Sequence, residues 1–273
     1  MKRILKKLIS FPVAGIVLLY IGVCIYFYSI QEMSLFPART IPHDFIYTFE
    51  TPHEELFLDS ADGARINAVL FKTDEPRGVV LYFHGNATNM RHMEHVGKPF
   101  TRMGFDLLAI DYRGYGKSVG ELSEQALFDD ARLAMDYLVD IGWRESDIIL
   151  YGRSIGSGVA TQLASVSTPR ALILYSPYYS MLDLVSEKVP YLPASLILKY
   201  PLDSATYMQS VSAPVLILHG DKDTLIPISH ALDLAAVRGQ LIRFPQGDHN
   251  NLTRFPEFWQ AIEAFMDDYR KPE

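Results

Sequence analysis

Residues Asp147–Gly158 read DIILYGRSIGSG, and this stretch decides the fold. Ile148–Tyr151 is a short apolar run of the kind that forms a buried strand. Gly152–Gly156 (GRSIG) interrupts the run, and Ser157–Val166 then favours a helix. The sequence therefore predicts a strand, a sharp turn and a helix, with Ser154 at the turn.

A serine at the centre of G-x-S-x-G, between a strand and a helix, is similar to the nucleophile elbow of α/β-hydrolases. We expect Ser154 to adopt a strained backbone conformation that lifts its hydroxyl above the sheet. Gly152 and Gly156 are expected to be glycines because strand and helix cross there without room for a Cβ atom. The start of the helix would direct backbone N–H groups at negative charge that develops beside Ser154.

The chain opens with a basic segment followed by an apolar one. The basic residues are Lys2, Arg3, Lys6 and Lys7. The uncharged run 8–31 is long enough to cross a bilayer as a helix, and its aromatic end, Tyr26–Tyr28, is typical of a membrane interface. We predict a basic tail and an uncleaved signal anchor in residues 1–30. Residues 31–273 would form the globular domain.

The orientation of this anchor follows from its flanking charges. Basic residues remain in the cytoplasm, so the N-terminus is expected there and the globular domain on the extracytoplasmic side. The alternative is a cleaved signal peptide, although such peptides have a shorter apolar region and a small-x-small cleavage site.

Charge and cysteine content exclude some functions. The chain has 25 Lys and Arg against 32 Asp and Glu, and four of the basic residues but no acidic residue precede Gln31. The remainder is therefore strongly acidic, which makes it a poor candidate for binding nucleic acid. The single cysteine, Cys24, lies in the apolar segment, so the domain has no disulfide and no reactive thiol.

Beyond residue 31, strand-like and helix-like patterns alternate. The expected strands, besides the one before Ser154, are Phe45–Phe49, Glu55–Asp59, Ala64–Phe71, Gly78–Phe83, Asp106–Asp111, Ala171–Tyr175, Pro214–Leu218 and Gln240–Phe244. The expected further helices are Met90–Met103, Glu121–Ile141, Ile228–Val237 and Phe258–Tyr269. Residues 176–212 contain four prolines and no clear strand, and are expected to form a small cap or lid. This order predicts an α/β-hydrolase fold with a mostly parallel central sheet and helices on both faces.

A triad of this fold is ordered serine, acid, histidine along the chain. His249 is the only histidine in the loop after the last expected strand, and it is the predicted base. Asp221 and Asp223 both follow the preceding strand and are candidates for the acid. Asp248, next to the histidine, is interpreted as a solvated neighbour.

The oxyanion hole of this fold uses two backbone N–H groups. One belongs to the residue after the nucleophile, Ile155. The other comes from the HGNA loop after the third strand, where Asn86 is the preferred donor and Ala87 the alternative.

Five motifs together resemble the Bem46-like branch of the α/β-hydrolases, which includes membrane-anchored ABHD-type enzymes. They are HGNATNM (84–90), DYRGYGKS (111–118), GRSIG (152–156), HGDKDTLIP (219–227) and GDHNN (247–251). HGDKDTLIP matches an HG-x-x-D-x-x-[IV]-P loop whose later aspartate faces the histidine, so the resemblance implies Asp223 as the acid and Asp221 as a turn residue. It implies a serine hydrolase of ester, thioester or lipid-acyl bonds that needs no metal or cofactor.

The sequence is also compatible with two other functions. One is a peptidase related to prolyl oligopeptidase, for which Arg153 and Lys199 could read a peptide terminus. The other is a membrane-tethered binding protein on a hydrolase scaffold. The large apolar residues of 176–212 either line an acyl pocket or cover the core: Tyr178, Tyr179, Met181, Leu182, Tyr191, Leu192, Leu196 and Tyr200.

Overall fold

The computed structural model describes residues 2–86 and 88–269, in which eight strands form one sheet. The strands are β1 (His53–Asp59), β2 (Arg65–Phe71), β3 (Val79–Phe83), β4 (Asp106–Ile110), β5 (Ile148–Arg153), β6 (Ala171–Tyr175), β7 (Val215–Gly220) and β8 (Gln240–Phe244). Their order across the sheet is β1-β2-β4-β3-β5-β6-β7-β8. The β1–β2 and β2–β4 pairs are antiparallel and the other pairs are parallel, which confirms the predicted α/β-hydrolase fold.

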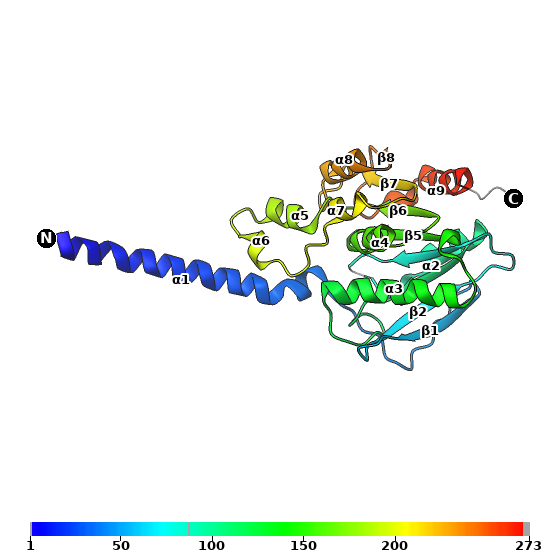
Figure 1. Cartoon of the computed structure of the whole chain (residues 1–273), viewed down its shortest axis with the longest axis horizontal. Helices are drawn as coiled ribbons and strands as arrows, with labels where there is room; N and C mark the ends of the chain where they lie inside the picture. Colours follow the sequence, from blue (N-terminus) through cyan, green and yellow to red (C-terminus); the bar gives the residue numbers. More distant parts are fainter. Residues whose placement is uncertain (1, 87, 270–273) are drawn as a thin grey trace.

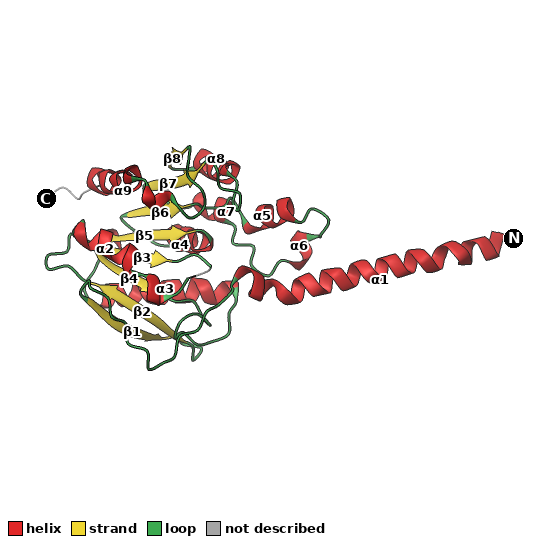
Figure 2. Cartoon of the chain, turned by 180° about the vertical axis from the view of Figure 1, so that it is seen from behind, coloured by secondary structure: helices red, strands yellow, loops and turns green. Residues whose placement is uncertain are grey.

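Helices cover both faces of this sheet (Figure 2). The helices are α1 (Lys2–Leu35), α2 (Glu94–Arg102), α3 (Glu124–Asp140), α4 (Ile155–Ser165), α5 (Met181–Lys188), α6 (Ala194–Ile197), α7 (Ser204–Met208), α8 (Ile228–Val237) and α9 (Pro256–Asp268). Short 3-10 turns lie at Met90–His92, Glu145–Asp147 and Leu252–Arg254. Residues of α3, α4 and α8 share one hydrophobic core with the sheet, and residues of α2 and α9 share the other.

The apolar runs of the central strands follow from this layering. In β3, Leu81 and Phe83 belong to the core on the α3–α4 side, and Val80 and Tyr82 belong to the core on the α2–α9 side. Successive side chains of a strand point to opposite faces, and both faces are covered here. Every position of β3 is therefore buried and apolar.

The predicted edge strand Phe45–Phe49 is wrong. The structure has no strand there, and the edge of the sheet is β1. Tyr47 instead stacks on Phe49 with ring centroids 5.4 Å apart, and Phe49 packs on Phe71 at 5.1 Å. Aromatic residues at every second position suit an edge strand and an extended segment lying across a sheet face equally well, and here the second arrangement buries the rings.

Helix α1 extends away from the globular domain, so that the two chain ends lie at opposite ends of the molecule (Figure 1). Its part Val13–Leu35 is long and apolar enough to cross a membrane. Leu18 and Leu19 within it are 68% and 70% exposed, as side chains of a membrane span would be outside a bilayer. The helix joins the domain where Phe36 packs against Tyr200, with ring centroids 4.9 Å apart.

Residues 176–212, called the insert below, connect β6 to β7 and contain α5, α6 and α7 without a strand. The insert lies beside the part of α1 that is nearer to the globular domain (Figure 1). Its large apolar residues fill the two expected roles, and two of them fill neither. Tyr178, Met181 and Leu192 line a cavity, Tyr200 packs in the core, and Tyr191 and Leu196 are exposed.

Candidate active site

Ser154 lies in a strained turn between β5 and α4. Its φ is 52° and its ψ is −121°, a conformation that non-glycine residues rarely adopt. A Cβ atom on Gly152 would lie 2.5 Å from the carbonyl oxygen of Gly156, and one on Gly156 would overlap the carbonyl oxygen of Phe83. The two glycines let α4 start against the ends of β5 and β3, which holds Ser154 above the sheet.

His249 lies between Ser154 and Asp223. Its Nε2 atom is 3.0 Å from Ser154 Oγ, and its Nδ1 atom is 2.7 Å from Asp223 Oδ2. All three residues are buried, with exposed fractions of 6–8%. Three residues that are far apart in the sequence are thus joined by two hydrogen bonds in the order serine, histidine, aspartate.

Asp223 and Asp221, the two acid candidates, have different surroundings. The second oxygen of Asp223, Oδ1, accepts hydrogen bonds from the N–H groups of Leu225 (2.9 Å) and Ile226 (2.8 Å). Asp221 instead pairs with Arg243 on the surface through two hydrogen bonds of 2.9 Å. Only Asp223 contacts the histidine.

The charge of Asp223 is stabilised by its partners. Burial by itself raises the pKa of this carboxyl group, but the hydrogen bond and charge of His249, together with the Ile226 N–H, lower it below its ordinary value. His219 also faces Asp223, with its Nε2 atom 3.5 Å from Oδ2. Asp248 does not contribute, because its carboxylate accepts bonds from Asn250 and Asn251.

The two predicted oxyanion donors lie beside Ser154. Ile155 is the first residue of α4, and both it and Asn86 line the same cavity as Ser154. Ala87, the alternative donor, lies outside the described residues. A Cβ atom on Gly85 would lie 3.5 Å from the Cβ atom of Ser154, so the HGNA loop passes close to the nucleophile.

Two tyrosines of DYRGYGKS position the HGNA loop, a role that the sequence reasoning missed. Tyr112 Oη donates to the carbonyl of His84 (2.8 Å), and Tyr115 Oη donates to the carbonyl of Asn86 (2.9 Å). With these carbonyls held by the tyrosines, the loop is fixed beside Ser154. The alternation of aromatic residues and glycines in DYRGYGKS was the available signal.

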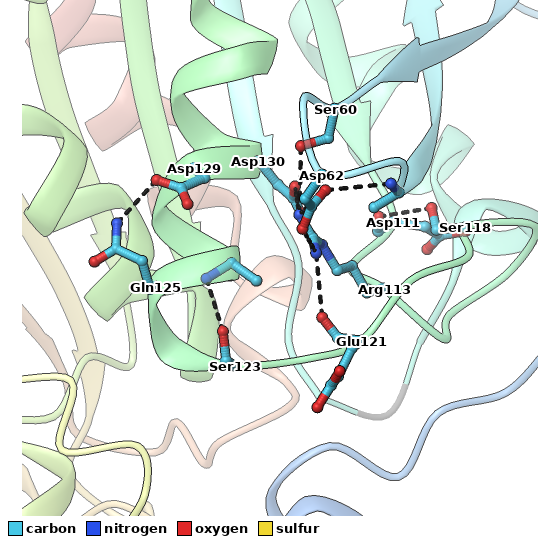
Figure 3. A network of polar contacts seen from close by, with 12 residues as sticks. Ser60, Asp62, Asp111, Arg113, Ser118, Glu121, Ser123, Gln125, Asp129 and Asp130 are labelled. Carbon is cyan, nitrogen blue, oxygen red and sulfur yellow. Dashed lines mark hydrogen bonds and ion pairs between the residues drawn. The ribbon is translucent and has the colours of Figure 1, made fainter.

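A buried arginine fixes the DYRGYGKS loop in turn (Figure 3). Arg113 forms two hydrogen bonds of 2.9 Å with Asp130 on α3, and its guanidinium also binds Asp62 in the β1–β2 turn. At the end of the loop, Ser118 Oγ donates to the carbonyl of Asp111. These contacts tie the loop to α3 and to the β1–β2 turn and close it on itself.

A cavity of about 440 Å³ opens at Ser154. Three regions of the chain line it: the end of α1 (Phe27, Ile30, Gln31, Ser34 and Leu35), the insert (from Tyr178 to Leu198) and the loops of the site (Asn86, Ser154, Ile155, Leu225 and Ile226). None of the described residues that line it is Asp or Glu, and the single charged one is Lys188. The cavity is therefore predominantly apolar.

The described part of the chain offers no metal site. No group of three His, Cys, Asp or Glu side chains is arranged there to hold an ion.

Sequence comparisons relate the chain to known proteins. A family model described as "Serine aminopeptidase, S33" (Hydrolase_4) matches residues 74–204. Protein bem46 of Schizosaccharomyces pombe is 30% identical over 233 residues, which cover 80% of this chain and 78% of that protein. The lysophosphatidylserine lipase ABHD12 of Xenopus tropicalis is 28% identical over 225 residues, covering 69% of this chain and 57% of that protein.

Solved structures agree with the fold. An esterase of Pyrococcus furiosus superposes with a TM-score of 0.69 at 18% identity, covering 86% of this chain and 97% of the esterase. An esterase of Exiguobacterium antarcticum gives a TM-score of 0.61 at 17% identity, covering 78% of this chain and 100% of the esterase.

Proposed function

The chain belongs to the α/β-hydrolase superfamily, in its Bem46-like branch, and on this premise we propose that it is a serine hydrolase that cleaves carboxylic esters or thioesters of acyl chains. The observation that carries the proposal is the pair of hydrogen bonds from Ser154 through His249 to Asp223, at the floor of an apolar cavity. The proposed nucleophile, base and acid lie within hydrogen-bond distance of one another, which supports this function.

The reaction has two steps. His249 Nε2 takes the proton of Ser154 Oγ as this oxygen attacks the substrate carbonyl, and Asp223 stabilises the imidazolium. The same nitrogen then gives the proton to the departing alcohol or thiol, leaving an acyl-enzyme. Water, activated by His249, hydrolyses the acyl-enzyme and releases the carboxylic acid and free Ser154.

The negative charge of the tetrahedral intermediate is assigned to the N–H groups of Ile155 and Asn86. Ile155 supplies a donor at the start of α4, where the helix dipole adds to the interaction. Asn86 supplies a donor from the loop held by Tyr115. A single donor of this kind typically changes turnover by about 10²–10³.

The lining of the cavity favours an acyl substrate. Aliphatic and aromatic side chains make up most of the wall, and a long hydrocarbon chain would be desolvated there. The lipase among the relatives and the esterases among the structural neighbours agree with this substrate class. We propose that the insert is the cap that closes this acyl site.

A peptidase is the second candidate, because the matching family model is described as a serine aminopeptidase. An aminopeptidase needs a carboxylate near the scissile bond to bind the amino terminus of its substrate, whereas Asp and Glu are missing from the described cavity lining. Arg153 binds Asn250 and stacks on Tyr175, and Lys199 pairs with Glu32. These two basic residues are therefore occupied outside the cavity.

We further propose that α1 anchors the protein, with its N-terminus in the cytoplasm and the hydrolase domain on the extracytoplasmic side. The length and apolar composition of Val13–Leu35 support the span, and the basic N-terminal residues support the orientation. The partners in this arrangement are the membrane and an acyl substrate.

A chain-length series of nitrophenyl esters tests the function. The full-length protein should hydrolyse these esters and favour longer chains, while Ser154→Ala should reduce turnover to the background rate. Cleavage of aminoacyl nitroanilides without ester turnover would favour the peptidase. Absence of both activities would favour the third alternative, a tethered binding protein.

A further inference from the structure

The tip of the insert, Val189–Leu198, is a ten-residue stretch with an unusual surface. Its sequence VPYLPASLIL contains no charged residue, and it lies between Lys188 and Lys199. Leu196 is 83% exposed, the largest value for a large apolar side chain among residues 13–86 and 88–269, and Tyr191 is 61% exposed. An uncharged surface with such exposed apolar side chains is typical of a site that contacts a membrane or another apolar partner.

The same tip contacts the apolar helix α1 at two levels. Tyr20 Oη donates to the carbonyl of Tyr191 (2.9 Å), and the Gln31 amide binds Ile197 and Lys199. Tyr20 and Gln31 are about 16 Å apart along the helix, at 1.5 Å per residue. The insert therefore lies alongside the C-terminal part of Val13–Leu35, the segment that is long enough to cross a membrane.

The contacts of Gln31 and Tyr20 suit a loop inside a bilayer. Gln31 Nε2 donates to the carbonyl of Ile197 (2.7 Å), and Gln31 Oε1 accepts from the N–H of Lys199 (2.8 Å). Irregular backbone at membrane depth is tolerated only where its polar groups are satisfied by protein. Polar side chains within an otherwise apolar helix thus satisfy backbone groups of the neighbouring loop.

The charge that follows the tip, Lys199, lies where the membrane surface would be. Lys199 Nζ is 3.2 Å from Glu32 Oε1 and 4.6 Å from the ring centroid of Tyr28. Glu32 is the first acidic residue of the chain and ends the uncharged run of α1. Lysine and tyrosine at the end of a span are typical of the interface between hydrocarbon and head groups.

We propose that the insert tip, Val189–Leu198, enters the lipid bilayer beside α1 and that acyl chains pass laterally from the bilayer into the cavity at Ser154. The cavity supports this route, because Phe27, Ile30 and Ser34 of α1 form one wall and the insert forms another. The membrane helix is thus part of the substrate site as well as an anchor. The lateral route rests on the proposed hydrolase function, whereas the insertion of the tip does not. A site supplied by this route would take lipids that reside in the membrane as substrates.

Fluorescence of a labelled tip tests insertion without reference to activity. The host is full-length Cys24→Ser protein in phosphatidylcholine vesicles. An environment-sensitive dye is attached to a cysteine introduced by Leu196→Cys or, as a control, by Val166→Cys. The native Val166 is 62% exposed at the end of α4. The dye at 196 should emit at shorter wavelength and be quenched by nitroxides on the lipid chains. Equal quenching of both dyes by aqueous iodide would overturn the insertion.

Turnover of Leu196→Asp tests the lateral route. Leu196 does not line the cavity, so hydrolysis of a soluble nitrophenyl butyrate should be unchanged, while hydrolysis of a long-chain ester in vesicles should fall about tenfold or more because a charge is costly within the bilayer. Val166→Asp should alter neither rate. An equal loss for both substrates, or no loss for either, would overturn the lateral route. Wild-type protein that hydrolyses no ester would overturn the hydrolase function. In that case the fluorescence measurement still tests the insertion of the tip.

Discussion

Two histidine–aspartate pairs lie at the same end of the sheet, and only one of them meets a nucleophile. His249 Nδ1 is 2.7 Å from Asp223 Oδ2, and the opposite ring nitrogen is 3.0 Å from Ser154 Oγ. His84 Nε2 is 3.2 Å from Asp111 Oδ1, and both side chains of this second pair are fully buried. The same two residue types thus serve different purposes a short distance apart.

The pairs differ in which ring nitrogen of the histidine carries the proton. Leu225 and Ile226 donate to one oxygen of Asp223. Its other oxygen accepts the hydrogen bond of His249 Nδ1–H, which leaves Nε2 free to accept from Ser154. This arrangement holds the imidazole in the tautomer that a general base requires.

In the second pair the opposite ring nitrogen faces the aspartate, at 3.2 Å. His84 Nδ1 lies 2.7 Å from the carbonyl of Gly85 and donates to it, so Nε2 presents a lone pair to Asp111 when the ring is neutral. Burial raises the pKa of the Asp111 carboxyl group above its ordinary value. We infer that this pair shapes the HGNA loop and has no part in proton transfer.

Replacing the acid of the catalytic pair should have the largest effect. In Asp223→Asn the Leu225 and Ile226 N–H groups retain the amide oxygen, so the amide NH₂ faces His249 Nδ1 and forces the wrong tautomer. Ester turnover should fall about 10⁴-fold with the fold intact. Kinetics with a soluble ester and circular dichroism measure both; a variant with more than a tenth of wild-type turnover would contradict the assignment of the acid.

Removing a positioning hydroxyl should have a moderate effect. Tyr115→Phe deletes the bond to the carbonyl of Asn86, worth about 0.5–1.5 kcal/mol, and kcat should fall about three- to tenfold. KM should change less than twofold, because the loop positions an oxyanion donor and does not enclose the acyl chain. Tyr137→Phe on α3 is the matched control. Equal changes in both variants would show that Tyr115 has no specific role.

The isosteric substitution Asp111→Asn in the second pair should have little effect on ester turnover. In Asp111→Asn the amide NH₂ can donate to the His84 Nε2 lone pair, while the amide oxygen still accepts from the N–H of Met90. Turnover should remain within about threefold of wild type, since no altered group touches Ser154 or substrate. A loss comparable to that of Asp223→Asn would show that both pairs take part in proton transfer.

The two aspartates should also give stability differences of opposite sign. The pKa of Asp223 is lowered, so its stabilising contribution is complete above the unfolded pKa of about 3.9 and disappears as the pH falls through the folded value. The pKa of Asp111 is raised, so its ionised form destabilises the fold at neutral pH, and this effect disappears as the pH falls below about 3.9.

Thermal unfolding in detergent measures this contrast. At pH 7, Asp223→Asn should unfold a few degrees below wild type and Asp111→Asn at or above it, at about 2–4 °C per kcal/mol. Both differences should shrink towards pH 3. A difference that grows as the pH falls would contradict the sign for that residue.

Much of the site could be predicted from the sequence because each candidate follows a strand. Ser154, Asp223 and His249 come after β5, β7 and β8, whose carboxyl ends meet at one edge of a parallel sheet. The structure places the three in contact, and it separates Asp223 from Asp221 by their hydrogen bonds. Local patterns were sufficient here because the topology of the sheet supplies the long-range contact.

Other features could not be predicted because local patterns do not distinguish their partners. Phe27 and Ile30 belong to an apolar run, and the same residues would serve to face lipid or to line a cavity beside Ser154. The rings of Phe45 and Phe49 would suit a strand or a segment across a sheet face. His84 precedes a glycine and indicates a loop, but its pairing with Asp111 depends on the parallel pairing of β3 with β4.

The most direct test of the central claim is covalent labelling of Ser154 by a fluorophosphonate. Intact-mass and peptide mass spectrometry of the full-length protein should show one adduct, located on Ser154, and no adduct in Ser154→Ala. An adduct on another residue, or undiminished labelling of Ser154→Ala, would contradict the proposal that His249 and Asp223 activate this serine as the nucleophile.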